Sequence, residues 1–223
     1  MITRVKICCI GSVEEAKMAI QSGASALGLV AKMPGGPGVI SDKLIIKIAR
    51  SVPPAISTFL LTSETSADEI IEHHKRTFTT AIQLVDELKQ GSHEEIKLAL
   101  PAIKLVQVIH VISEKSVDEA IRISEKVDAL LLDSGNPFLK VKELGGTGRV
   151  HNWKLSRKIA EQSKVPVFLA GGLTADNVQK AIDEVMPFGV DVCSGVRTNN
   201  KLDLKKLEAF MRAVHLTACP NLH

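Results

Sequence analysis

The sequence has few cysteines and no motif that would gather them into a metal site. The four cysteines are Cys8, Cys9, Cys193 and Cys219, so the chain has no CxxC pair. None of them has zinc-like spacing to any of the seven histidines. We therefore expect no bound metal, and we expect the thiols to be reduced, as is usual in the cytoplasm.

Long runs of one charge and long apolar runs are also missing. The formal charge is +3, and acidic and basic residues alternate without a basic run that could follow a phosphate backbone. No window reaches the roughly 18 uninterrupted apolar residues of a membrane span. Arg4 and Lys6 interrupt the first apolar run, which is unlike a signal peptide. We expect a cytoplasmic protein that binds a small molecule and neither nucleic acid nor membrane.

Eight short apolar runs alternate with eight stretches of helical periodicity along the whole chain. No linker, low-complexity segment or obvious repeat interrupts this alternation, so we expect one domain over residues 1–223. The predicted strands are 4–8, 26–30, 56–61, 81–85, 104–111, 129–133, 165–170 and 189–193. The predicted helices are 13–22, 42–51, 67–77, 93–100, 117–126, 153–163, 175–185 and 204–214, with Ser12, Ser41 and Thr174 as start signals.

This alternation favours an α/β fold, a (β/α)8 TIM barrel. Strands that are buried on both faces and joined by crossover helices must be parallel, and eight such units suit a closed barrel. The alternative is a doubly wound open sheet. That fold usually has a glycine-rich turn after its first strand, and Cys8-Cys-Ile-Gly is not GxGxxG.

In a barrel of this kind the active site lies at the carboxyl ends of the strands. Cys8 ends the first strand and Asp133 ends the sixth, so they would face each other across the barrel mouth. A thiolate is a competent general base, and a partly desolvated carboxylic acid can protonate a leaving oxygen. The competing interpretations are a small buried hydrophobe for Cys8 and a loop or capping residue for Asp133.

Two glycine-bearing turns follow the seventh and eighth strands. Gly171 and Gly172 lie in the first turn, and Ser194 and Gly195 lie in the second. Backbone amides in these two loops are where barrels most often bind phosphate. The pattern therefore predicts a phosphate site, although the glycines would also serve simple tight turns.

Further polar residues lie in the predicted loops or near the strand ends. Arg149 and Arg197 could pair with a phosphate or carboxylate, and His110 could contact a ligand, but each also has an ordinary structural interpretation. Cys193 is expected to pack near Cys8 or Cys9, because the eighth strand of a closed barrel adjoins the first. The pair His73-His74 is expected on a solvated helix face.

Several motifs together resemble phosphoribosylanthranilate isomerase, in the right order over nearly the whole chain. They are Lys6-Ile-Cys8, Gln83-Leu84, Leu131-Leu-Asp133, Gly145-Gly-Thr-Gly148 with Trp153, Ala170-Gly-Gly-Leu-Thr-Ala-Asp-Asn-Val178 and Val190-Asp-Val-Cys-Ser-Gly-Val196.

The resemblance implies a cofactor-free Amadori rearrangement in tryptophan biosynthesis, with a phosphorylated sugar as substrate. By the same resemblance Cys8 is the general base, Asp133 is the general acid, and Gln83 is a further candidate for substrate binding. Barrels of this type occur alone and as dimers, so the protein is expected to be a monomer or a homodimer.

The chain departs from the family pattern at several positions. The loop Met33-Pro-Gly-Gly-Pro-Gly-Val39 lacks the arginine that in the family meets the anthranilate carboxylate, Cys9 replaces a glycine, and Arg197 replaces a glutamate. Either Arg149 or Arg197 supplies the guanidinium from another loop, or the enzyme acts on a different phosphosugar amine. A non-catalytic phosphosugar-binding barrel and a Schiff-base aldolase are the remaining alternatives.

Overall fold

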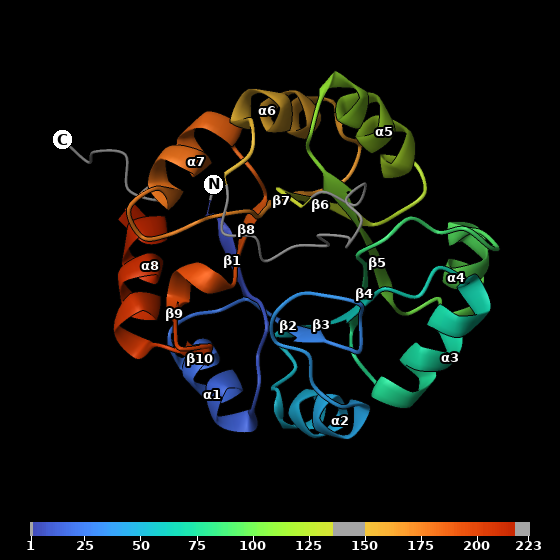
Figure 1. The fold of residues 1–223 in the computed structure, drawn as a ribbon, viewed down its shortest axis with the longest axis horizontal. Coiled ribbons are helices and arrows are strands. Elements are labelled where there is room, and N and C mark those ends of the chain that lie inside the picture. Colours follow the sequence, from blue (N-terminus) through green and yellow to red (C-terminus); the bar gives the residue numbers. More distant parts are fainter. Residues whose placement is uncertain (1, 136–149, 217–223) are drawn as a thin grey trace.

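The computed structural model describes residues 2–135 and 150–216. Within these ranges eight parallel strands close into a barrel and helices form a ring around it (Figure 1). The barrel strands are β1 (Arg4–Ile7), β2 (Ala26–Val30), β3 (Ser57–Thr62), β4 (Ala81–Leu84), β5 (Lys104–His110), β6 (Ala129–Asp133), β7 (Val167–Leu169) and β8 (Gly189–Val192). The helices are α1 (Val13–Gln21), α2 (Asp42–Ser51), α3 (Ala67–Thr77), α4 (His93–Ala99), α5 (Glu114–Ser124), α6 (Trp153–Gln162), α7 (Val178–Val185) and α8 (Leu204–Leu216).

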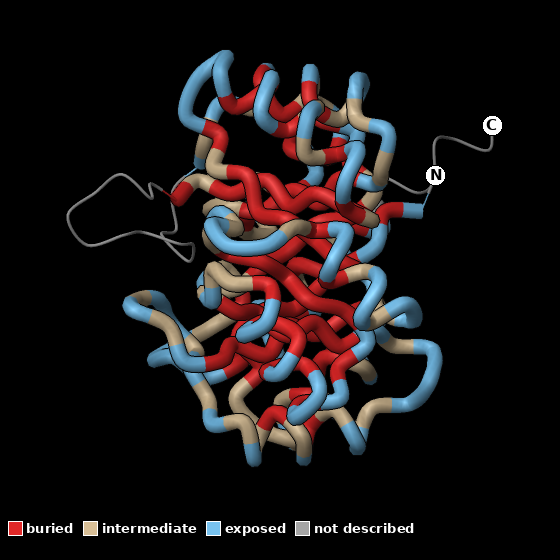
Figure 2. Tube along the Cα trace, turned by 90° about the vertical axis from the view of Figure 1, so that its right-hand side faces the viewer, coloured by how far each residue is buried: buried red, intermediate tan, exposed pale blue. Residues whose placement is uncertain are grey.

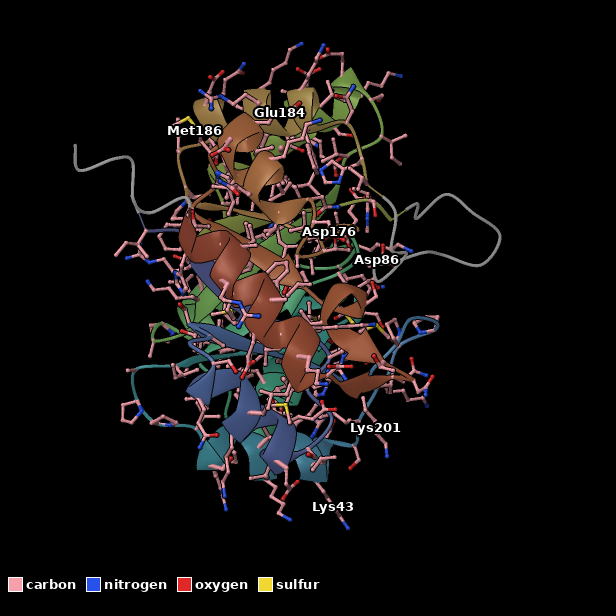
Figure 3. All side chains as sticks on the ribbon, turned by 90° about the vertical axis from the view of Figure 1, so that its left-hand side faces the viewer. Lys43, Asp86, Asp176, Glu184, Met186 and Lys201 are labelled. Atoms are coloured by element: carbon pink, nitrogen blue, oxygen red, sulfur yellow. The ribbon has the colours of Figure 1, made fainter. Side chains whose placement is uncertain are left out.

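The pairing of β1 with β8 closes the barrel. Their register runs from Arg4 opposite Gly189 to Ile7 opposite Val192, and β1 also pairs with β2. The predicted (β/α)8 barrel is therefore confirmed, and the doubly wound sheet is excluded. Because every strand is parallel to its neighbours, all carboxyl ends open at one end of the barrel. Asp86, just after β4, and Lys201, after β8, lie toward that end (Figure 3).

Alternation along each strand divides the apolar side chains between two cores. Ile7, Leu27 and Leu60 belong to the large core between strands and helices. Phe59 and Phe168 belong to a second cluster, and their rings meet edge to face at 6.1 Å between centroids. Since successive strand residues point to opposite faces, this second cluster fills the barrel interior. Figure 2 shows the resulting continuous buried centre and the exposed outer turns.

Serine caps start several of the helices where the sequence predicted them. The Ser12 hydroxyl accepts from the Glu15 amide at 3.1 Å, and Ser41 accepts from the Leu44 amide at 3.4 Å. Two starts were predicted incorrectly. The residue that precedes α7 as its N-cap is Asn177, not Thr174, and α5 begins at Glu114, three residues before the predicted start. The Thr174 amide instead donates a hydrogen bond to the Asn177 side chain at 2.9 Å, and the helix begins only after Asn177.

The prediction for His73 and His74 was wrong, because both side chains are buried in α3. His73 lies between Thr62 and Asp42, with ring nitrogens 3.4 and 3.2 Å from their oxygens. His74 bonds the Thr79 carbonyl oxygen through Nε2 at 2.8 Å. His73 therefore connects α3 to side chains of β3 and α2, and His74 connects it to the loop backbone at Thr79. The helix has a wider buried face than its apolar residues alone indicate.

The chain adds a short structure after β8 that the sequence did not predict. A 3-10 turn over Ser194–Val196 leads into a two-stranded antiparallel hairpin, β9 (Arg197–Thr198) and β10 (Lys201–Leu202). Asn199 and Asn200 form its tip with positive φ angles of 50° and 62°. Among the helices in the described residues we find no candidate for a membrane span.

Candidate active site

A cavity that opens to solvent lies at the carboxyl end of the barrel, with about 680 Å³ of empty space when its open mouth is included. Its walls combine apolar side chains of the barrel interior with the ends of β1, β6, β7 and β8 and with the loop after β2. The residues that line it include Cys8, Cys9, Met33, Pro37, Leu61, Gln83, Asp133, Gly171, Gly172, Asp191, Cys193 and Ser194. The cavity therefore contains the predicted pair Cys8 and Asp133.

Cys8 follows β1 and its side chain points into this cavity. Its amide donates to the Val192 carbonyl at 2.9 Å, so the residue continues the β1–β8 pairing. The neighbouring strand has Gly28 opposite, and a Cβ added there would lie 2.8 Å from Cys8 Sγ. The glycine thus leaves the space that the Cys8 sulfur occupies, and any side chain there would displace the thiol.

Asp133 ends β6 and is buried, with 7% of its surface exposed. Burial raises its pKa to about 6, although the Ser134 amide, 2.7 Å from Oδ1, favours the charged form. Asp191 adds to the rise through like charge. A carboxyl group of this kind still holds its proton in about one molecule in ten at pH 7, and it can act as a general acid.

Lys6 and Asp191 form a buried ion pair beneath the cavity. Lys6 Nζ lies 2.9 Å from Asp191 Oδ1, and the Lys6 side chain has no solvent exposure. Burial opposes its charge, but the facing Asp191 carboxylate outweighs this effect and holds the Lys6 pKa above its ordinary value. The sequence analysis missed Asp191 as a cavity residue. A signal was present, since an acidic residue stands inside the apolar run of β8.

The two glycine turns contact each other at the cavity rim. Gly171 and Gly172 have φ angles of +83° and +63°, which favour glycine, and both line the cavity. Ser194 lines it from the second turn. Gly195 is not among the lining residues; a Cβ there would collide with the Leu173 carbonyl oxygen. Gly195 therefore allows the second turn to pack closely on the first.

Comparison with known proteins agrees with this arrangement. The family model described as "N-(5'phosphoribosyl)anthranilate (PRA) isomerase" matches residues 5–213. This chain belongs to that family. N-(5'-phosphoribosyl)anthranilate isomerase 2 of Methanosarcina mazei is 38% identical over 213 residues, which cover 94% of this chain and 93% of that protein. The isomerase of Methanocella arvoryzae is 32% identical and covers 97% of this chain and 100% of its own.

Solved structures of the isomerase family have the same barrel. The crystal structure of phosphoribosyl anthranilate isomerase from Thermotoga maritima has a TM-score of 0.80 at 29% identity, and covers 95% of this chain and 98% of that one. A second isomerase structure, in complex with reduced 1-(o-carboxyphenylamino)-1-deoxyribulose 5-phosphate, has a TM-score of 0.77 at 27% identity over 95% of this chain and 98% of that one.

Arg197, one of two arginines considered for a substrate carboxylate, does not line the cavity. Its Nη2 donates to Glu15 Oε2 at 3.0 Å and to the carbonyl oxygens of Cys8 and Cys9. Its Nη1 donates to Glu15 and to the Asn200 carbonyl. The guanidinium therefore binds the backbone that carries Cys8. Arg149, the other arginine considered for a substrate carboxylate, lies outside the described residues.

His110 and Gln83 lie in different surroundings. His110 ends β5, and burial lowers its pKa. It lines a separate hollow with Asp86 and Glu119 rather than the cavity that contains Cys8. Gln83 lies inside the barrel on β4 and lines the cavity, and within the described residues its buried Oε1 has no hydrogen-bond partner. Of these two candidates, only Gln83 is positioned at the candidate active site.

Cys9 has a backbone conformation that favours glycine. Its φ angle is +63°, in the left-handed region. Its sulfur lies 2.7 Å from that of Cys193, which confirms the expectation that Cys193 packs near the first strand. The loop after β2 covers Cys9, because a Cβ at Gly38 would collide with Cys9 Cβ.

Proposed function

We propose that this protein catalyses the Amadori rearrangement of N-(5-phosphoribosyl)anthranilate to 1-(2-carboxyphenylamino)-1-deoxyribulose 5-phosphate. Membership of the isomerase family supports this reaction. The single observation that carries the mechanism is that one cavity contains a thiol, a carboxyl group with a raised pKa and two contacting glycine turns. The reaction opens the ring and transfers protons within one substrate, so a general acid, a general base and a phosphate site are sufficient.

The substrate phosphate binds at the two glycine turns in this proposal. Gly171, Gly172 and Ser194 line the rim of the cavity, and their turns expose backbone amides close to the start of α7. Gly195 contributes by allowing the two turns to approach. Fixing the phosphate at this edge would hold the ribose over the cavity centre, and such positioning makes the proton transfers effectively intramolecular.

Asp133 is the general acid of the first step. Its proton passes to the ring oxygen of the ribofuranose, the C1–O bond breaks, and the nitrogen lone pair forms the Schiff base. Burial supports this role because it raises the pKa of Asp133 to about 6, so that a protonated fraction persists near neutral pH.

Cys8 is the general base of the second step. Its thiolate removes the proton from C2 of the sugar, and the electrons of that C–H bond neutralise the iminium nitrogen to give an enolamine. The enolamine then tautomerises to the ketone. Lys6 Nζ and Cys8 Sγ both border the space above Gly28, so a buried positive charge lies near the reacting sulfur and its developing charge.

The apolar wall of the cavity fits the aromatic half of the substrate. Met33 and Pro37 of the loop after β2 line this cavity, and so does Leu61 of β3. Gln83 Oε1 is free within the described residues to accept a hydrogen bond from the substrate amine or a hydroxyl. Arg197 supports the Cys8 turn in this proposal and does not bind the substrate carboxylate, because both Nη atoms are engaged with Glu15 and backbone carbonyls and the residue does not line the cavity.

Consumption of freshly generated phosphoribosylanthranilate, followed by fluorescence, tests the function. We expect turnover by the wild-type protein and its loss in the Asp133→Asn variant, which removes the acid but keeps the side-chain shape. A folded protein that binds a phosphosugar without turning over this substrate would refute the proposal. Activity on another phosphoribosyl amine would then identify a sister isomerase, which the missing arginine of residues 33–39 would explain.

We further propose a cytoplasmic enzyme that is a monomer or a homodimer. A dimeric phosphoribosylanthranilate isomerase is known from Thermotoga maritima. Sedimentation of the purified protein over a range of concentrations distinguishes the two states.

A further inference from the structure

The two thiols that the proposed mechanism does not use, Cys9 and Cys193, meet at the seam where the barrel closes. Cys9 follows β1 and Cys193 follows β8, and the two strands pair directly up to Ile7 opposite Val192. Their sulfurs lie 2.7 Å apart and both cysteines are free. A disulfide has a sulfur–sulfur distance of about 2.05 Å, so only a small movement separates this contact from a covalent bond.

The backbone around the pair is anchored by hydrogen bonds. The register of β1 and β8, continued by one residue, places Cys8 opposite Cys193. Cys9 follows with a left-handed φ angle of +63°, and it is the Cys9 sulfur that contacts Cys193. Arg197 donates to the Cys9 carbonyl oxygen, and the Cys8 amide donates to the Val192 carbonyl at 2.9 Å. These bonds hold the residues next to both cysteines.

The two thiols differ in the way that thiol–disulfide exchange requires. Cys193 is half-buried and lines the cavity, so a small molecule can reach it. Its pKa is lowered by the hydrogen bond with Cys9 and by the charge of Arg197. Cys9 is buried, and its pKa is raised by its hydrogen bonds with Cys193 and Cys8. Cys193 is thus suited to attack the small disulfide as a thiolate, and Cys9 is suited to resolve the mixed disulfide that forms.

We propose that Cys9 and Cys193 form a reversible disulfide by exchange with a low-molecular-weight disulfide, leaving Cys8 as a free thiol. The Cys193 thiolate attacks one sulfur of the small disulfide, forms a mixed disulfide and releases one thiolate. Cys9 then loses its proton to solvent and attacks the Cys193 sulfur, which releases the second thiolate. The two cysteines are oxidised by two electrons, and the small disulfide is reduced to two thiols.

This bond would join the turn that carries Cys8 to the turn that begins with Ser194. It would link the first and last strands of the barrel across the closing seam, next to the proposed base and the proposed phosphate site. Formation of this disulfide does not depend on the substrate and is measured without an activity assay.

The test incubates the folded protein with glutathione disulfide and then alkylates the remaining thiols before mass spectrometry. A Cys219→Ser background removes the fourth cysteine, which lies outside the described residues. We expect the loss of two hydrogen atoms, one alkylated cysteine and a crosslink between the peptides that contain Cys9 and Cys193. Dithiothreitol should restore three alkylated cysteines.

Single variants in this background distinguish the three possible pairs. Cys8→Ser should still form the crosslink, whereas Cys9→Ser and Cys193→Ser should not. A crosslink that persists in Cys9→Ser but disappears in Cys8→Ser would overturn the proposal, and so would glutathione adducts without an internal crosslink. Circular dichroism confirms that each variant is folded, and Cys193→Ala replaces any serine variant that is not.

Discussion

Replacing Asp133 by asparagine should abolish turnover while making the protein more stable at neutral pH. The carboxyl group is buried at the end of β6, and burial raises its pKa from 3.8 to about 6. Its folded-state pKa therefore lies above the unfolded one. In such a case the folded protein binds the proton more tightly, and the stability that this provides is lost as the pH rises toward the folded pKa.

The size of this effect follows from the pKa shift. A rise of about 2 units corresponds to about 3 kcal/mol of folding free energy that is present below pH 4 and absent above pH 6. Asparagine does not ionise, and its side-chain oxygen can keep the hydrogen bond that the Ser134 amide now donates to Oδ1. The stability of the variant relative to the wild type should therefore rise by about 2 kcal/mol between pH 4.5 and pH 8.

Urea denaturation of both proteins at pH 4.5 and pH 8 measures this difference. The free energy of unfolding is compared between wild type and variant at each pH, and turnover is measured in parallel at pH 8. A stability difference that does not change with pH would show that Asp133 has no raised pKa, and the argument for its role as an acid would lose its physical basis. Near-wild-type turnover in the variant would refute that role directly.

Three further predictions concern the turn that carries Cys8. Cys8→Ala should lower turnover by about two to four orders of magnitude while leaving the melting temperature nearly unchanged; a variant with wild-type turnover would show that another group is the base. Gly28→Ala should lower kcat by about 10²-fold, because the new Cβ would lie 2.8 Å from the Cys8 sulfur. Its control is Gly11→Ala, where the nearest atom is a flexible Glu15 oxygen at 3.6 Å and no loss is expected. Arg197→Met should lower kcat by about 10-fold or more with little change in KM, because the guanidinium holds the Cys8 and Cys9 carbonyls; Arg197→Lys should restore part of kcat, and a change confined to KM would indicate substrate binding instead.

The fold could be predicted because each of its elements is recognisable from a short stretch of sequence. Each strand is a short apolar run and each helix has an amphipathic period, so the order of elements is readable without any long-range information. The general rule that barrels place their sites at the carboxyl ends of strands then selected Cys8 and Asp133. The cavity contains both residues.

Other residues have an environment that depends on elements far away in the chain. In the sequence, His73 is a polar residue in a polar helical segment. In the structure it is buried between Asp42 of α2 and Thr62 of β3. Arg197 begins β9 after the last barrel strand, yet its buried guanidinium pairs with Glu15 of α1. No local pattern shows which partner such a side chain meets.

The sequence by itself determined the alternation of strands and helices, the residues at the strand ends and the likeness to the isomerase family. Hydrophobic periodicity shows the elements, and the order of short motifs shows the family. Barrel closure decided the rest. It brings Lys6 to Asp191 across 185 positions and Cys9 to Cys193 across 184. Such contacts arise only when β1 pairs with β8, so the buried ion pair beneath the cavity and the thiol pair beside it are properties of the tertiary structure.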